Sequence, residues 1–164
     1  MTTRDEEFAE YFAARFGWAR RIAFALSGNW SDAEEIAQQS FVRVYARWSK
    51  VRLETVDAYL RTVLTRVFLD GRRRGAAREQ SVAELPEQAV PPDHSSHERL
   101  AMQAALMTVP PGQRAVLVLR FVADLSVEQV AETLGLSPGT VKSQSARGLA
   151  TLRVQLEAIS TRST

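Results

Sequence analysis

Apolar side chains recur every three or four positions along most of the chain, which is the spacing of a helix buried on one side. In residues 8–26 this repeat predicts one or two amphipathic helices that end at the turn pair Gly28-Asn29. In residues 33–48 it continues for four turns, with Ser40 as its one polar interruption. No alternating strand pattern of useful length occurs, so the sequence predicts an all-α fold.

The boundaries of these helices carry their own signals. Ser31 followed by Glu34 has the spacing of a capping box and predicts that the second helix opens at Ser31. A polar break at residues 49–54 precedes another helix from about Val56 to the run at 70–75. The large aromatic residues of the second helix and its flanks are expected in the core: Trp30, Phe41, Tyr45 and Trp48.

A segment of different composition divides the chain. Residues 79–97 contain three prolines and several acids with little periodicity, which is typical of a flexible tether. We therefore expect two small helical domains, residues 1–78 and 99–164, joined by an acidic linker over 79–98. Domains of about 70 residues have marginal cores, and docking on a larger partner would stabilise them.

The C-terminal part reads as a helix-turn-helix. Helix resumes near Glu98, and an unusually apolar stretch at 115–122 predicts the centre of a small bundle. The spacing Ala131-x3-Gly135-x5-Val141 is the one that this motif requires. The small Ala131 lets the two helices cross closely, Gly135 permits the positive φ of a tight turn, and Val141 packs the second helix onto the first. Ser137-Pro138 would cap and open that second helix, with Leu149 and Leu152 turned inward. An ordinary helical hairpin is the alternative.

The second helix of such a motif enters the major groove by its N-terminal part. Glutamine and arginine read base edges, and lysine and hydroxyl groups suit phosphates. The outward residues are Gly139, Thr140, Lys142, Ser143, Gln144 and Arg147.

Charge separates along the 164 residues, although 21 basic and 19 acidic side chains leave a net charge of only +2. Residues 1–78 carry +4, residues 79–98 carry −5 and residues 99–164 carry +3. Two basic segments favour a polyanionic partner; two solvated surfaces with a solubilising linker are the alternative. In the first segment, one aromatic residue and a series of arginines occur together: Tyr59, Arg61, Arg66, Arg72, Arg73, Arg74 and Arg78. This combination suits stacking on unpaired bases with neutralisation of their phosphates. A solvated helix C-terminus, where cations compensate the helix dipole, is the alternative.

Composition also excludes several classes of site. The chain has no cysteine and only two histidines, which rules out thiolate chemistry and makes a histidine metal site hard to build. We expect no catalytic residues, no metal and no cofactor. No apolar run reaches the roughly 18 residues of a membrane span, and residues 1–7 do not resemble a signal peptide. A cytoplasmic protein without membrane insertion is expected.

Several motifs resemble one family in order and spacing. Residues 32–45, Asp-Ala-Glu-Glu-Ile-Ala-Gln-Gln-Ser-Phe-Val-Arg-Val-Tyr, resemble the region 2.2 signature of bacterial sigma factors. Residues 109–120 resemble the start of region 4, and residues 125–131 with 135–143 resemble its helix-turn-helix. Together they resemble the extracytoplasmic-function (group 4) sigma factors, which have only regions 2 and 4, over residues 8–157.

The resemblance implies a subunit that directs core RNA polymerase to promoters, with two sets of polymerase contacts. Region 2 would bind the β′ clamp helices through Glu35, Gln38, Gln39 and Arg43. Region 4 would sit on the β flap. The linker would thread the RNA exit region, and its acids would mimic RNA charge. An anti-sigma factor is a further partner that the resemblance implies.

The resemblance also implies two DNA sites. The melted −10 strand would be held by Lys50, Arg52, Tyr59, Arg61, Arg66, Arg72, Arg73 and Arg74. The −35 duplex would be read by Thr140, Lys142, Ser143, Gln144 and Arg147. Some positions depart from the family pattern. Tyr59 replaces a common tryptophan and is either core or a stacking platform, Gln39 replaces a usual acid, and Gln144-Ser145 replace an arginine and an apolar residue.

Two other functions remain to be weighed. A helix-turn-helix regulator would bind duplex DNA alone as a dimer, but it has no reason to carry the region 2.2 motif. A nuclease would need convergent carboxylates, whereas Asp32, Glu34 and Glu35 sit at a helix start, where acids stabilise the dipole. The richness in arginine and alanine suggests a high-GC actinobacterium as the source.

Overall fold

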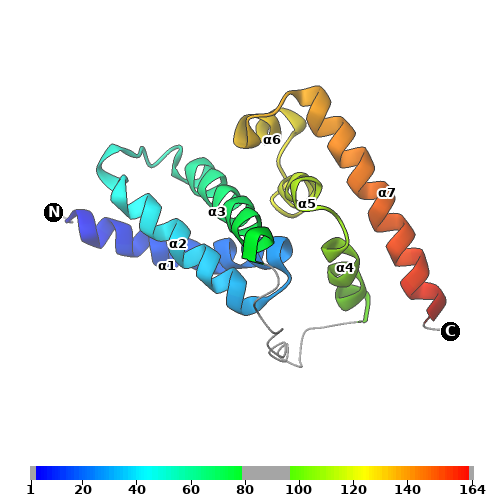
Figure 1. The fold of residues 1–164 in the computed structure, drawn as a ribbon. Coiled ribbons are helices and arrows are strands. Elements are labelled where there is room, and N and C mark those ends of the chain that lie inside the picture. Colours follow the sequence, from blue (N-terminus) through cyan, green and yellow to red (C-terminus); the bar gives the residue numbers. More distant parts are fainter. Residues whose placement is uncertain (1–2, 79–96, 163–164) are drawn as a thin grey trace.

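A computed structural model describes residues 3–78 and 97–162, and over these residues it is helical without a strand (Figure 1). The first part contains α1 (Arg4–Ser27), α2 (Trp30–Ala46), a 3₁₀ turn η1 (Trp48–Lys50) and α3 (Val56–Arg78). The second part contains α4 (His97–Met107), α5 (Pro111–Leu117), a π-helical turn η2 (Val118–Val122), α6 (Val127–Leu134) and α7 (Pro138–Arg162). The all-α prediction is confirmed. The predicted linker at 79–98 falls almost entirely outside the described residues.

The ends of α1 and α2 follow from their capping residues. The predicted stop at Gly28 is confirmed, because this residue closes α1 with φ 74°, a left-handed conformation that glycine adopts without strain. The predicted start at Ser31 is wrong. Asn29 is the N-cap instead: its backbone is extended and its side chain accepts a hydrogen bond of 3.1 Å from the amide of Asp32. Ser31 therefore already lies in the first helical turn.

The core of the first part joins α1, α2 and α3. Phe41 and Trp48 are buried there, as predicted, within a cluster of edge-on and tilted aromatic rings from α1, α2 and η1. Tyr45 was expected in the core, but it is 39% exposed, because its hydroxyl reaches outward to donate a hydrogen bond of 2.6 Å to Asp5. Trp30 is half-buried and stacks on Phe24, with ring centroids 3.9 Å apart.

The core of the second part lies between α5, η2, α6 and α7. Residues 114–119 are all buried, which confirms the prediction for the first part of the apolar stretch. The prediction is wrong for Phe121 and Val122 at its end, which are 57% and 53% exposed. Leu149 does not turn inward as predicted and is 36% exposed. The buried line of α7 instead runs from Val141 to Gly148, two helical turns later, so Leu149 points about 100° away from it. Leu152 does pack inward.

A third cluster unites the two parts. Side chains from α1 and α3 pack against side chains from α4, α5 and η2, and α6 lies against α3 (Figure 1). Its buried members are Ile22, Ala25, Leu26, Phe68, Leu106, Val109, Ala115, Leu117 and Val118. In this structure the two halves of the chain therefore share one apolar interface.

Candidate polymerase and nucleic-acid interfaces

The outer face of α2 presents the four polar residues predicted for polymerase binding. Alanines and aromatic or branched residues turn one side of this helix into the core, so the opposite side faces solvent. All four predicted residues are exposed on that side: Glu35, Gln38, Gln39 and Arg43. The amide of Gln39 donates a hydrogen bond of 3.1 Å to the carboxylate of Glu35 one turn earlier. The face is thus a preformed polar surface.

Sequence reasoning missed Val42, which lies within this polar face. Its side chain is 68% exposed although it is apolar. The helical repeat could have predicted this exposure. Val42 lies between Phe41, which faces the core, and Arg43, which faces solvent, and a helix turns a side chain at that position away from the core. A single exposed valine is ordinary on a protein surface, and here it adds apolar area to the polar face.

A cavity of about 350 Å³ adjoins the same face. It lies between the start of α2 and the end of α3, and Asp32, Glu35, Gln39, Arg72 and Arg114 contribute polar groups to its wall. Acidic and basic side chains therefore face one another across it.

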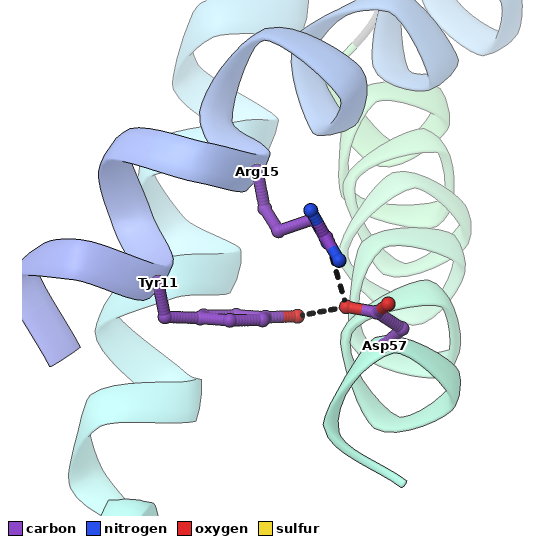
Figure 2. Close-up of polar contacts among 3 residues, drawn as sticks. All are labelled: Tyr11, Arg15 and Asp57. Carbon is purple, nitrogen blue, oxygen red and sulfur yellow. Dashed lines mark hydrogen bonds and ion pairs between the residues drawn. The ribbon is translucent and has the colours of Figure 1, made fainter. Parts of the chain in front are cut away.

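The start of α3 is tied to α1 by one carboxylate (Figure 2). The hydroxyl of Tyr11 donates to Oδ1 of Asp57 at 2.8 Å, and Nε of Arg15 donates to the same oxygen at 3.0 Å. Partial burial opposes ionisation of Asp57, but the hydrogen bonds from Arg15 and Tyr11 outweigh it and lower the pKa of this carboxyl below its usual value. Burial and the bond to Asp57 raise the pKa of Tyr11, so its proton stays in place.

Immediately before this tie lies the loop predicted to hold the melted strand. Lys50 and Arg52 are exposed, as a strand-binding role requires. Leu53, which sequence reasoning did not single out, is 71% exposed beside them. The carbonyl of Arg52 accepts hydrogen bonds from both the amide and the hydroxyl of Thr55, which forms a tight turn. The loop thus presents an apolar tip that follows two cations and precedes the exposed acid Glu54, and apolar side chains of this kind can insert between bases.

The cations predicted along α3 divide into two groups. Arg66 and Arg72 are exposed and free to meet phosphates. Arg61 is half-buried with its guanidinium 5.9 Å from the ring of Trp18, and Tyr59 packs against the first core. The core reading of Tyr59 is therefore favoured over a stacking platform. The side chains of Arg73, Arg74 and Arg78 lie outside the described ones.

The helix-turn-helix has the predicted turn. Ser126 and Gln129 form a capping box that opens α6. Gly135 closes α6 at φ 67°, and the amide of Leu136 returns to the carbonyl of Ala131 at 2.9 Å. The hydroxyl of Ser137 then accepts a hydrogen bond of 3.1 Å from the amide of Thr140, which caps α7. The turn holds α7 against α6, as the motif requires.

The first turns of α7 form the candidate recognition surface. Val141 is fully buried, so the residues around it fall on the outer side. Lys142, Ser143 and Arg147 are exposed, whereas Thr140 and Gln144 are half-buried. The Thr140 hydroxyl is 2.8 Å from that of Ser137 and belongs to the cap. The hydroxyl of Ser143 also has a structural partner, because it donates a hydrogen bond of 3.1 Å to the carbonyl of Thr140.

The described residues supply no sign of a metal centre or a membrane segment. Among them, no group of three or more histidine or acidic side chains is placed to hold a metal ion. No helix in the described ranges is long and apolar enough to cross a bilayer. What the geometry does provide is a polar helix face, a cationic loop and helix, and a helix-turn-helix. These features define a nucleic-acid-binding protein of the helix-turn-helix class.

Comparison with known proteins identifies the family within that class. Residues 12–78 match the model of sigma-70 region 2, and residues 99–152 match the model of sigma-70 region 4. The chain therefore belongs to the extracytoplasmic-function sigma factors of the sigma-70 family, promoter-recognition subunits whose regions 2 and 4 bind core RNA polymerase and promoter DNA.

Relatives with curated names support this membership. The chain is 38% identical over 141 residues to the ECF RNA polymerase sigma factor SigE of Mycolicibacterium smegmatis, covering 81% of this chain and 55% of that protein. It therefore spans only about half of the length of that relative. It is 36% identical over 153 residues to the RNA polymerase sigma-E factor of Streptomyces avermitilis, covering 92% of this chain and 86% of that protein.

Solved structures share the fold. The sigma factor RpoE of Bartonella quintana, solved in complex with the anti-sigma factor NepR, matches with a TM-score of 0.75 at 24% identity and covers 92% of this chain and 97% of its own. CnrH, solved in complex with the cytosolic domain of CnrY, matches with a TM-score of 0.66 at 22% identity, over 92% of this chain and 88% of its own.

Proposed function

We propose that this sigma factor engages polymerase and promoter through three separate surfaces. The outer face of α2, with Glu35, Gln38, Gln39 and Arg43 around Val42, contacts the β′ clamp helices. The loop at 50–54 and the outer side of α3 hold the melted −10 strand. The first turns of α7 read the −35 duplex, while the rest of region 4 rests on the β flap. The protein carries no catalytic activity of its own and works in the cytoplasm.

One observation carries the polymerase surface: the four polar residues and Val42 are all exposed on the side of α2 opposite the core. Two observations support the DNA surfaces. Lys50, Arg52 and Arg66 are exposed on neighbouring parts of region 2, and Lys142 with Arg147 is exposed on the second helix of the helix-turn-helix. Positive charge toward phosphates supplies affinity, and the outward side chains of α7 supply base contacts.

The division of roles is tested by transcription with purified core polymerase on a pooled promoter library. The wild-type protein should direct transcription from a subset of promoters that share two elements, and alone it should bind duplex DNA weakly. Tight, dimeric binding to duplex DNA without polymerase would instead indicate an ordinary helix-turn-helix regulator.

The polymerase surface has its own test in the same assay. Glu35→Lys should reduce capture of core polymerase, because it places a cation at the centre of the proposed contact. Glu34→Lys is the matched control, since this exposed residue is turned about 100° around the helix. Equal capture by the two variants would contradict the assignment of this face.

A further partner proposed for this protein is an anti-sigma factor. Two proteins that share this fold were solved with an anti-sigma factor or a cytosolic partner domain bound. We infer that a partner of this type restrains the present protein. Co-purification of the tagged protein from its host tests this inference: a stoichiometric partner other than polymerase subunits is expected, and recovery with polymerase alone would contradict it.

A further inference from the structure

Lysine is almost absent from this chain, and its two lysines lie on the two proposed DNA surfaces. The sequence has 21 lysines and arginines together, of which 19 are arginines and two are lysines, Lys50 and Lys142. Lys50 belongs to the loop assigned to the melted −10 strand, and Lys142 belongs to the first turns of α7, assigned to the −35 duplex. Each DNA surface therefore carries one side-chain amine, a group that occurs nowhere else in the chain.

The structure holds the backbone of Lys50 and leaves its side chain open to solvent. The amide of Lys50 donates a hydrogen bond of 2.9 Å to the carbonyl of Arg47, and buried Trp48 anchors the same 3₁₀ turn. The side chain is exposed. Within residues 3–78 and 97–162 its ammonium group has no hydrogen-bond or ion-pair partner. A reagent in solution can therefore reach it.

Lys142 has the same setting in region 4. It directly follows Val141, which is fully buried, and its own side chain is exposed on the outer side of α7. The helix carries no acidic side chain before Glu157, about four turns later. None of the described acids forms an ion pair with this ammonium group. Both lysines are thus fixed at the backbone and free at the amine.

A lysine amine supports a reaction that a guanidinium does not. Arginine stays protonated in proteins, whereas lysine can lose its proton and act as a nucleophile. The nitrogen attacks the carbonyl carbon of an acyl thioester or acyl phosphate, and an N–C bond forms. The C–S bond of the thioester, or the C–O bond of the acyl phosphate, breaks, and the thiolate or phosphate leaves with the electron pair. The resulting amide is neutral, so one attraction to a DNA phosphate is lost.

The proposed polymerase face offers no site for this reaction. Its residues on α2 are Glu35, Gln38, Gln39, Val42 and Arg43, and none of them is a lysine. Acylation of the chain's lysines therefore changes the charge of both DNA surfaces and leaves the charge of the polymerase face as it is.

We propose that Lys50 and Lys142 are acylation sites, modified by an acyl thioester or an acyl phosphate, at which the loss of charge weakens promoter binding while polymerase binding is kept. Arginine supplies the permanent cations of this protein, and lysine supplies the two whose charge can be removed. The proposal rests on the proposed roles of the loop at 50–54 and of α7.

The sites are tested on the full-length protein with three reagents, which also distinguish the source of the acyl group. The protein is treated with acetyl phosphate, with acetyl coenzyme A, or with acetyl coenzyme A and a dialysed extract of its host. Peptide mass spectrometry should find acetylation at Lys50 and Lys142 with at least one reagent. A lysine that stays unmodified with all three is not an acylation site.

The consequence is tested with the same samples. At about 100 mM salt, one duplex phosphate contact contributes roughly eightfold to affinity. Acetylated holoenzyme should therefore bind promoter DNA at least about fivefold more weakly than the untreated sample, with equal capture of core polymerase. The double variant Lys50→Arg/Lys142→Arg is compared only with its own untreated sample and should not respond. Loss of polymerase capture on acetylation, or an equal response of the double variant, would overturn the proposal.

Lys142→Gln separates this proposal from the proposed function, because glutamine has the neutral charge of the acylated side chain. The slope of log affinity against log salt should decrease by about 0.9. Arg153→Gln, which removes one exposed cation further along α7, should keep the wild-type slope. An unchanged slope for Lys142→Gln would overturn both the −35 surface and the role of acylation there. A reduced slope with no acetylation found would leave the DNA surface standing and overturn the modification alone.

Discussion

The hydroxyl of Tyr11 and the carboxylate of Asp57, 46 residues apart, are joined by a hydrogen bond of 2.8 Å that ties α1 to the first turn of α3 (Figure 2). Arg15 donates to the same oxygen, so one carboxylate serves two donors from successive turns of α1. The loop with Lys50, Arg52 and Leu53 begins just before this point. Its position relative to the rest of region 2 therefore depends on this tie.

Asp57→Asn should lower the free energy of unfolding by about 1 kcal/mol at pH 7, a modest value because Arg15 and Asp57 are both 41% exposed. The folded state lowers the pKa of Asp57. Its stabilisation is therefore present above the unfolded pKa of about 3.9 and is lost as the pH falls through the folded pKa. Urea unfolding at pH 7 and pH 3 should show the gap from wild type shrinking. Asp70→Asn, an exposed acid on the same helix, is the control, and an equal gap at both pH values would contradict the prediction.

Gly135→Val should destabilise region 4 and abolish −35-dependent transcription. The residue has φ 67°, and a Cβ there would meet nothing within 4 Å, so the cost is backbone strain rather than a clash. For a β-branched residue this strain costs more than about 1 kcal/mol. Gly139→Ala lies in the first turn of α7 without positive φ and should be tolerated. Equal melting temperatures for the two variants would show that the turn does not need glycine.

Gly148→Ala and Gly71→Ala should change stability in opposite directions. At Gly148 a Cβ would lie 2.9 Å from Cδ1 and 3.1 Å from Cγ of buried Leu117, so α7 must move away from α5. At Gly71 nothing lies within 4 Å of the new methyl group. This exposed helical position should therefore gain about 0.5–1 kcal/mol from the higher helix propensity of alanine. Denaturant midpoints measure both, and a stabilised Gly148→Ala variant would show that the two helices are not in close contact there.

Gln144→Ala should relax the preference at one position of the −35 element and leave the −10 element unchanged. A good bidentate base contact provides about 1–3 kcal/mol of discrimination. Arg147→Ala should instead weaken binding about equally across sequences if its contact is to phosphate. Arg153→Ala, exposed further along the same helix, is the matched control. A promoter library transcribed with each variant decides the matter, and an unchanged −35 preference for Gln144→Ala would mean that the register of the recognition helix is wrong.

Replacing Arg72, Arg73 and Arg74 together with alanine should weaken promoter binding by the holoenzyme and flatten its dependence on salt. When fewer phosphates are neutralised, binding releases fewer counterions, so the slope of affinity against salt decreases. Affinities measured between about 50 and 200 mM salt provide the slope. An unchanged slope would indicate that the cluster is only a solvated helix end.

The sequence by itself determined the helical class, the helix-turn-helix and the outward side of α2. Each depends on local information: a period of three to four residues, a glycine at a turn, or a cap beside an apolar run. Gly135, Ser137 and Val141 accordingly lie where the spacing placed them. The start of α2 was predicted wrongly at Ser31, because the spacing of a capping box also occurs within the first turn of a helix. Asn29 is the N-cap of α2.

Only the tertiary structure decided which polar and apolar groups meet across distant segments. Tyr45 and Leu149 both satisfy the helical repeat, yet both are exposed. The hydroxyl of Tyr45 donates a hydrogen bond to Asp5 at the surface. On α7, Gly148 rather than Leu149 packs against Leu117 of α5. Arg114 looks like any surface cation in the sequence. It is buried because carbonyls at the ends of two helices, one of them 88 residues away, converge on its guanidinium, and no local pattern encodes that convergence.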